Sequence, residues 1–584
     1  MKQVCVTFLL TMLMSMVGAI AFAQDPYTFE ENGIYYRIMS DLYYYDYENY
    51  ISYDGEVEVV NPNEDPLGSP NPYTGAIYIP STVTRTITNE NAEPWEEPEY
   101  TFTYAVTSIG WNAFCGSGIT SIYIPGSIKT IGEFAFSGCT ALNAINVDPN
   151  LSFVTTPTSG IACEGGDICI DTTPWFQSQP SGIVYLGKVA YKYKGYGSSS
   201  ISIKQGTERI EYHCFSGQLI SNIPSSVKSI AHGAFRYCRF TSFSLPANLS
   251  ELGSSSFEGC EGLTDVTIPD NVKIFYASTF SGCGLSSLTI GKGVKCIFRG
   301  NHSAYVDYGY DYEYDNLENA ELSPHSYAWE LTELTKIKDY YDVDFDCEVP
   351  ENGPWYYSDS DEAPRYGLDV QTINVAEGNT VFDSRDNCNA VVHTKTNTLV
   401  MGSTSTIIPN SITAIGWNAF KDCGITSLTI PSSVKVIDIE AFRGSKLTSI
   451  TIPASIQSIG VTTFANCLDL ASVVLEDGAK TISECEFAYC TNLTSVSLPT
   501  SVSSIGKNAF SGTGWYNNQA DRLLYLDNWL LGYKGDKPTG DIVIKSGTKR
   551  IADYTFLGCS GLTSVTIPNS VTTIPVFNVL FSRV

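Results

Sequence analysis

The chain has 584 residues, of which 62 are acidic and 34 are basic, so its formal net charge is −28. Such a charge repels phosphate backbones, which excludes nucleic acids and anionic lipids as favoured partners. Charged residues make up only 16% of the chain and apolar residues 43%, a composition that favours ordered structure over disorder. The length alone would suggest several globular domains, but a sequence repeat takes precedence over that estimate.

Residues 1–23 have the three parts of a secretory signal peptide: a basic start, an apolar run too short for a comfortable membrane span, and a cleavage site. Ala21 and Ala23 give the small-x-small pattern of that site. We therefore expect cleavage before Gln24, export, and a location outside the cell or at its surface. Cys5 precedes the apolar run, which argues against a lipid anchor, and no later apolar run is long enough to span a membrane.

Residues 24–102 are expected to form a β-rich N-terminal cap, and a repeat fills residues 103–298 and 382–584. Two of its best copies are "CGITSLTIPSSVKVIDIEAF" at 423 and "CTNLTSVSLPTSVSSIGKNAF" at 490. The phenylalanine that closes each copy returns every 22 or 23 residues in the second array, at Phe420, Phe442, Phe464, Phe487 and Phe510. A period this steady is typical of a solenoid, so the predicted fold is a β-rich stack of 22–23-residue coils.

The type of residue at each position of the repeat can be explained physically. In "LTSVTIP" apolar residues alternate with hydroxyl residues, which predicts a short strand with Val and Ile inside and Thr or Ser outside. Proline ends the strand because it has no N–H for the ladder. The "SVxxI" segment returns two aliphatic side chains to the interior, and "GxxAF" closes the coil with an aromatic plug. One coil buries little by itself, so the coils must stack.

These motifs resemble the BspA-type leucine-rich repeat, which occurs in surface proteins of Bacteroidetes and of some mucosal protozoa. The opening "YTFEENGIYYRIMS" is similar to the N-terminal start of such proteins. The resemblance implies a leucine-rich repeat solenoid used for adhesion or for binding host molecules, and it implies no catalytic residues. The last copy departs from the pattern, because Pro575 replaces the glycine and no capping or sorting module is recognisable behind it. Either the array ends abruptly or the reading frame is truncated.

A longer unit occurs twice, as "WFQSQPSGIVYLGKVAYKYKG" at 175 and "WYNNQADRLLYLDNWLLGYKG" at 515, with a looser relative at 382. Each contains two apolar runs joined by a short polar turn, which predicts a β-hairpin inserted between ordinary coils. We expect Trp175 and Trp515 to pack the base of the hairpin rather than to bind sugar, because Trp buries a large apolar area.

The chain has 17 cysteines, and eight of them follow the repeat. These eight lie three residues after the plug phenylalanine, at Cys139, Cys238, Cys260, Cys283, Cys423, Cys467, Cys490 and Cys559. We interpret them as a column of small buried residues that are mostly unpaired. The absence of a C-x-x-C pair argues against zinc. Cys163 and Cys169 lie outside the column, and whether they form a disulfide is open.

The repeat pattern stops between residues 299 and 381, in a segment rich in tyrosine and carboxylate. With few aliphatic residues to bury, this insertion should project from the solenoid. Exposed tyrosines offer large contact area at low entropic cost. We therefore predict that ligand-binding residues in the insertion include Tyr308, Tyr310, Asp311, Tyr312, Tyr314 and Asp315. A solvated insertion without a partner is the alternative, and calcium held by Asp311, Glu313 and Asp315 would lack a recognised loop pattern.

Motifs of catalysis are lacking: the five histidines are scattered, and no G-x-S-x-G, H-E-x-x-H or phosphate-binding glycine loop occurs. We expect a monomeric binding protein, not an enzyme, that needs no cofactor and contacts a protein or a glycan. Two alternatives remain. One is a secreted hydrolase of glycans or peptides that uses acidic residues of the 299–381 insertion, and the other is a structural spacer without a ligand.

Overall fold

The computed structural model describes residues 28–45, 51–63, 71–88, 99–156, 168–195, 199–298, 369–556 and 558–574. They belong to two compact units, one that ends at Ala234 and one that begins at Phe235. Nearly all regular structure is β-strand, which confirms the predicted fold class. The predicted signal peptide lies outside the described residues, and the domain boundaries drawn from the sequence stay predictions.

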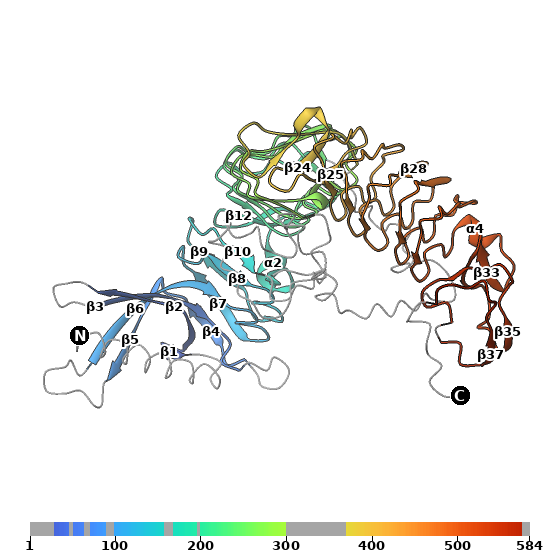
Figure 1. The fold of residues 1–584 in the computed structure, drawn as a ribbon. Helices are drawn as coiled ribbons and strands as arrows, with labels where there is room; N and C mark the ends of the chain where they lie inside the picture. Colours follow the sequence, from blue (N-terminus) through green and yellow to red (C-terminus); the bar gives the residue numbers. More distant parts are fainter. Residues whose placement is uncertain are drawn as a thin grey trace, which may run out of the picture. The chain divides into compact units, whose positions relative to one another are not determined.

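A sheet of long strands opens the first unit (Figure 1). Its strands are β1 (Phe29–Glu31), β2 (Ile34–Tyr45), β3 (Ile51–Val59), β5 (Thr82–Thr88) and β6 (Glu99–Ile109). β2 pairs antiparallel with β1 and β3, whereas β6 pairs parallel with β3 and antiparallel with β5. The end of β6 also pairs in parallel with β8 (Thr130–Gly132), a strand of the first coils. The sheet therefore continues into the solenoid without a break in hydrogen bonding.

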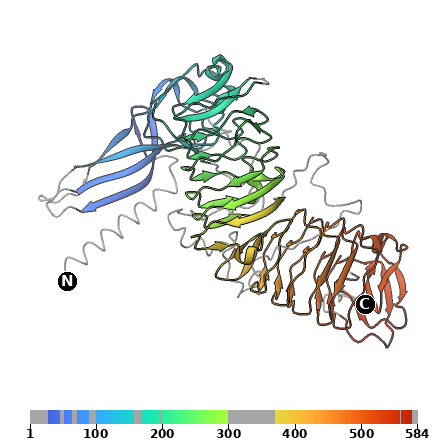
Figure 2. The ribbon, with the colours of Figure 1, turned by 90° about the horizontal axis from the view of Figure 1, so that it is seen from above.

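In each unit the coils stack one on the next (Figure 2), and the parallel pairings of their strands form two rows. The first row, formed by the "LTSVTIP" segments, contains β4 (Thr74–Tyr78), β7 (Gly118–Ile124), β9 (Ala144–Val147), β14 (Leu219–Ile220), β16 (Arg239–Phe240), β18 (Asp265–Thr267), β20 (Leu285–Ile290), β22 (Val370–Val375), β28 (Ser449–Ile452), β30 (Ser472–Leu475), β35 (Gly540–Val543) and β37 (Leu562–Thr566). The alternation of inward and outward side chains is as predicted, for example in β28, where Ile450 and Ile452 are buried between exposed Ser449 and Thr451.

The second row comes from the "SVxxI" segments, for which the sequence predicted no strand. It contains β8, β10 (Val154–Thr156), β13 (Arg209–Ile210), β15 (Ser229–Ile230), β17 (Glu251–Leu252), β19 (Ile274–Tyr276), β21 (Cys296–Phe298), β26 (Ala414–Ile415), β27 (Val436–Ile437), β29 (Ser458–Ile459), β31 (Thr481–Ile482), β32 (Ser504–Ile505) and β36 (Arg550–Ile551). With two or three residues each, these strands are too short to show an alternating pattern.

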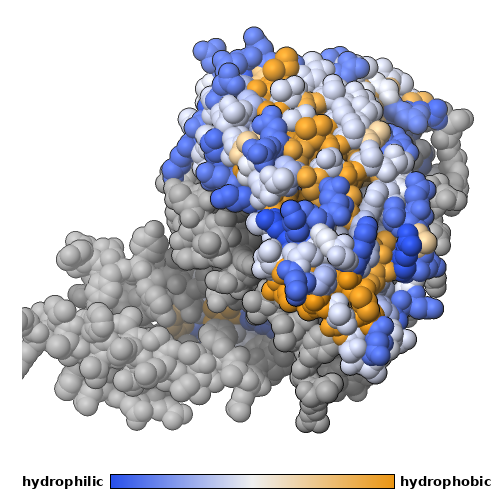
Figure 3. Space-filling model, turned by 45° about the vertical axis from the view of Figure 1, so that its right-hand side comes forward, coloured by the Kyte–Doolittle hydropathy of each residue, from blue (hydrophilic) through white to orange (hydrophobic). Residues whose placement is uncertain are grey.

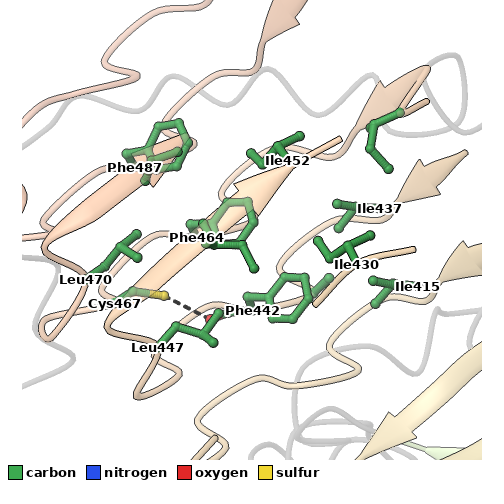
Figure 4. Close-up of a cluster of buried hydrophobic side chains, with 14 of the residues drawn as sticks. Ile415, Ile430, Ile437, Phe442, Leu447, Ile452, Phe464, Cys467, Leu470 and Phe487 are labelled. Atoms are coloured by element: carbon green, nitrogen blue, oxygen red, sulfur yellow. Dashed lines mark hydrogen bonds between the residues drawn. The ribbon is translucent and has the colours of Figure 1, made fainter. Parts of the chain in front are cut away.

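The plug phenylalanines stack on one another inside the coils in several runs, of which the longest joins Phe420 to Phe510. In the second unit Phe442, Phe464 and Phe487 are fully buried, with ring centroids 5.1 and 5.5 Å apart and planes within 8° of parallel (Figure 4). In the first unit Phe114 and Phe136 stack in the same way at 5.5 Å. The spacing between coils therefore equals a favourable stacking distance for aromatic rings.

The backbone turns sharply on both sides of the plug. Around Phe487, for example, Cys485 and Tyr489 have φ angles of 51° and 61°, in the left-handed region. In the next coil the residue equivalent to Tyr489 is Gly512, with φ +70°, and a Cβ atom there would lie 2.5 Å from the Tyr489 ring. The backbone conformation therefore favours glycine at this position, and the ring of Tyr489 leaves no room for a side chain.

All three predicted hairpins are present. They consist of β11 (Gly182–Leu186) with β12 (Val189–Lys194), β24 (Ala390–His393) with β25 (Thr398–Gly402), and β33 (Leu523–Leu526) with β34 (Trp529–Tyr533). The short strand β23 (Phe382–Asp383) extends the second hairpin. The second strand of each hairpin pairs in parallel with the second row, through β13, β26 and β36 respectively. The hairpins are therefore integrated into the ladder rather than attached beside it.

The two hairpin segments that match closely in sequence, at 175–195 and 515–535, have the same polar contacts and the same preceding helical turn. A helical turn precedes each hairpin, α2 (Pro174–Ser178) and α4 (Gly514–Asn517), and short 3-10 turns occur at η1 (Ile170–Thr172), η2 (Ala277–Phe280) and η5 (Arg385–Asn387). Lys194 and Lys534 each donate to main-chain carbonyls at the end of the helical turn, including those of Gln179 and Gln519 at 2.8 and 2.7 Å. As predicted, Trp175 and Trp515 pack against the core.

The cysteine column lies inside the coils, and its thiols also donate hydrogen bonds, which the sequence analysis did not predict. Five thiols donate to the carbonyl oxygen of the plug phenylalanine in the previous coil, at 3.0–3.1 Å: those of Cys139, Cys260, Cys283, Cys467 and Cys490. Figure 4 shows the contact of Cys467 with Phe442. Burial raises the pKa of Cys283 to about 12, so this thiol stays protonated and keeps its proton for the bond. Cys559, in the last described coil, is only half-buried.

A thiol count tests whether this column is unpaired. We expect the denatured, unreduced protein to react with several equivalents of a thiol reagent per chain, because a thiol that donates a hydrogen bond carries no disulfide. The same titration after reduction gives the total. A reading near zero before reduction would show that the column is cross-linked. Cys163 lies outside the described residues, so its pairing with Cys169 stays open.

Candidate ligand-binding surface

The predicted binding residues lie outside the described part of the chain. Tyr308, Tyr310, Asp311, Tyr312, Tyr314 and Asp315 all belong to residues 299–368, and so does Glu313 of the calcium alternative. The binding role of these residues stays a prediction, and the structure bears on it only through the coils on either side.

The coils before and after the insertion stack directly on each other. β20 pairs in parallel with β22 over Leu285–Ile290, and this pairing resumes at Val370, inside the range assigned to the insertion. Asn379 donates from its side-chain amide to the carbonyl oxygens of Gly291 and Val294, at 3.0 Å each. The ladder therefore closes across residues 299–368, and the coils on both sides need none of these residues to pair.

The outward side chains of the first row form the most regular exposed surface in the described residues. Thr429, Thr451, Ser497 and Thr566 are exposed, as their hydroxyl character predicts. The same coil position is held by apolar residues in other coils, and Ile407, Val474 and Val543 are 70%, 55% and 72% exposed. Figure 3 shows several patches of apolar side chains among polar ones on one face of the molecule. Sequence reasoning missed these residues, although each directly precedes a buried aliphatic residue: Ile408, Leu475 and Ile544 respectively.

In the first unit this outward position is held by tyrosine in two successive strands. Tyr78 of β4 pairs in register with Tyr123 of β7, and their rings are stacked at 4.7 Å with planes 6° apart. Tyr78 is 67% exposed, whereas Tyr123 is half-buried. Asn146 of β9 follows in the same row and is exposed. The sequence analysis did not single out this pair, because the two tyrosines become neighbours only when the coils stack in register.

Several charged side chains of the described residues pair between neighbouring coils. Glu208 accepts from Lys188 at 2.9 Å and from Lys228 at 3.1 Å, and the hydrogen bond from Lys188 is the main reason that its pKa is lowered. Arg236 donates through two nitrogens to Glu258 of the next coil. Each group bridges neighbouring coils, so these ion pairs act on the ladder rather than on a ligand.

The fold also brings together two histidines that are apart in the sequence. The rings of His213 and His232 lie 5.9 Å apart, and that of Tyr212 stacks on His232 at 5.3 Å. His393 is buried and its Nδ1 lies 2.8 Å from the hydroxyl of Thr396. Among the described residues no group of three His, Cys, Asp or Glu side chains is placed to hold a metal ion. The pair is a structural contact between coils.

Within the same described residues, no helix is both long and apolar enough to cross a membrane. The sequence matches the profile of the "BspA type Leucine rich repeat region" over residues 77–157, 185–303, 402–517 and 533–579, in six copies. The matched segments make up more than half of the chain. The chain belongs to the BspA-type leucine-rich repeat family. This confirms the resemblance drawn from the "LTSVTIP" and "GxxAF" motifs.

Among solved structures the chain is similar to leucine-rich repeat proteins of bacteria. A leucine-rich repeat protein of Bacteroides ovatus is 20% identical, with 94% of this chain and 90% of that chain covered and a TM-score of 0.29. A leucine-rich cell surface protein of Faecalibacterium prausnitzii is 17% identical, with 93% and 100% covered and a TM-score of 0.35. The pneumococcal vaccine antigen PcpA is 13% identical, with 94% and 98% covered and a TM-score of 0.31. No match is found among curated proteins. At these TM-scores the family assignment rests on the repeat sequence.

Proposed function

We propose that this BspA-type protein is exported, resides at the cell surface or outside the cell, and binds a protein or glycan as an interaction scaffold. Export rests on the N-terminal sequence, in which a basic start, an apolar run and Ala21-Phe22-Ala23 form a signal peptide. Binding is supported by the repeat architecture, which offers a long surface of regularly spaced side chains. The net charge of −28 argues against polyanionic partners.

The observation that carries the proposal is the direct stacking of coils across the insertion. β20 and β22 pair as ordinary neighbours, and Asn379 ties the two coils together. A segment that the ladder does not use is free to serve another purpose, and the composition of residues 299–368 is that of a contact surface rich in tyrosine and carboxylate. We assign the predicted tyrosines and acids of the insertion to ligand contact.

Deleting residues 301–366 and joining the ends through a short Gly-Ser linker is expected to leave folding intact. The ladder closes without the insertion, and loop-closure entropy changes by only about 0.6 kcal/mol for each doubling of loop length. Far-UV circular dichroism and thermal unfolding should therefore match the full chain. Binding to a printed array of extracellular-matrix proteins and glycans should weaken for the ligands that the full chain retains.

A second variant controls for spacing, with residues 301–366 replaced by a Gly-Ser linker of the same length. Loss of binding in both variants assigns the contact to the chemistry of the insertion. Unchanged binding in both would move the contact to the outward side chains of the first row. Incubation of the full chain with the glycans and peptides of the array addresses the hydrolase alternative, because turnover of any of them would replace the scaffold proposal with an enzyme.

A further inference from the structure

The stacked pair Tyr78 and Tyr123 exposes an aromatic face at the edge of a sheet. One face of the Tyr78 ring is covered by Tyr123, at 4.7 Å and 6° between planes. The side chain is nevertheless 67% exposed, so the exposed area belongs to the opposite face and the ring edges. β4 is the outermost strand in the order β4-β7-β9, and no other described strand pairs with it. The open face therefore points away from the sheet that holds it.

The surroundings of the pair are small and uncharged. In the row beside the tyrosines, Ala76, Ser121 and Ala144 lie next to one another in register across the three strands. The strand sequences TGAIY, GITSIYI and AINV contain no charged residue. A charged group of a ligand therefore finds no opposite charge to pair with in these three strands.

The exposed ring of Tyr78 and its uncharged neighbours suit a neutral sugar. A hexose ring has an apolar face of C–H bonds, which packs against an aromatic ring, and equatorial hydroxyls, which exchange hydrogen bonds with amide and hydroxyl groups. Tyr78 supplies the ring, and the exposed amide of Asn146 lies in the same row beyond Tyr123. A sulfated or otherwise anionic glycan is disfavoured by the net charge, and a basic peptide finds no carboxylate in these strands.

We propose that Tyr78, held in place by Tyr123, is a stacking site for an uncharged hexose unit of a glycan, with Asn146 as a polar contact. This proposal rests on the proposed scaffold function and names one ligand class and one place for it, separate from the insertion. Tyr123 acts as a positioning residue, because its ring fixes the plane of Tyr78 and leaves only one face open.

The test uses the mature chain, residues 24–584, with neutral hexasaccharides of glucose, mannose and galactose as probes and a heparin-derived hexasaccharide as the anionic comparison. Saturation-transfer difference NMR should show C–H protons of at least one neutral hexasaccharide receiving magnetisation from the protein. Isothermal titration then gives its affinity. Tyr78→Ala should weaken binding about tenfold, the effect of losing one well-placed aromatic contact. Tyr78→Phe keeps the ring and should retain affinity.

Val543→Ala is the matched control, because Val543 holds the same coil position, is 72% exposed and pairs with Thr566 rather than with an aromatic residue. It should bind like the parent protein. Binding of heparin instead of the neutral probes, or unchanged binding by Tyr78→Ala, would overturn the stacking site. If no hexasaccharide binds but the parent protein still retains proteins on the array, the stacking site is wrong and the scaffold function stands. If nothing binds in either assay, both proposals fall.

Discussion

Replacement of Phe464 by alanine is expected to destabilise the second unit by about 3–5 kcal/mol. The side chain is fully buried, and its ring is stacked between Phe442 at 5.1 Å and Phe487 at 5.5 Å. Both neighbours are fixed by their own coils, so the cavity cannot close by a small shift. Since each coil is stabilised chiefly by its neighbours, the loss should weaken the ladder on both sides. Urea unfolding followed by circular dichroism measures the effect.

Two variants show whether the effect depends on the stacked ring. Phe464→Leu retains most of the apolar volume and should cost less than half of the alanine penalty. Val474→Ala removes a side chain that is 55% exposed in the next coil and should change the free energy of unfolding by less than about 0.5 kcal/mol. A Phe464→Ala protein as stable as its parent would contradict the stacked core.

Glu486→Gln is expected to stabilise the protein near neutral pH by about a few kcal/mol, because the folded state raises the pKa of the Glu486 carboxyl. Glu486 is fully buried at the coil position that holds Ala441, Thr463 or Ala509 in neighbouring coils. Its Oε2 accepts from the main-chain N–H of Ser483 at 2.6 Å, and its Oε1 has no hydrogen-bond partner among the described residues. Burial raises the pKa of this carboxyl from 4.5 to about 8.

The sign of the pH dependence follows from that pKa. Because the folded state holds the proton more tightly than the unfolded state, the carboxyl opposes folding as it ionises. Stability should be greatest below about pH 4.5, fall as the pH rises toward about 8, and level off above it. Glutamine resembles the protonated carboxyl and should remove this slope. The measurement is the difference in unfolding free energy between parent and variant from pH 5 to pH 9, in which other titrations cancel.

The same substitution at Glu440 is the control, because it should act in the opposite direction. Glu440 is also largely buried, but the charges of Lys421 and Arg443 outweigh burial and lower its pKa. Lys421 donates to it at 2.6 Å and Arg443 binds its other oxygen. Glu440→Gln should therefore destabilise by about 1–3 kcal/mol at pH 7. The contribution of Glu440 should be lost as the pH falls below about 4.5. Equal signs for the two variants would contradict the environments described.

Some features of the fold could be predicted from the sequence, and others could not. The plug phenylalanines and the three hairpins follow from patterns within one coil, and the structure confirms them. It confirms the first-row strands in most coils, but residues 424–430 and 493–498 carry the pattern and form no strand. The proposed contact residues of the insertion were read from composition alone. They stay a prediction, because the structure describes only the coils that flank them.

The sequence by itself determined the repeat, its family and the inside and outside of each first-row strand, because alternation, proline and glycine act on neighbouring residues of the chain. Only the tertiary structure decided which residues of different coils touch. The stack of Tyr78 on Tyr123, the thiol of Cys467 against the carbonyl of Phe442, and the burial of Glu486 between coils all depend on register. Register is set by the packing of whole coils against each other, and each coil carries only one side of these contacts in its own sequence.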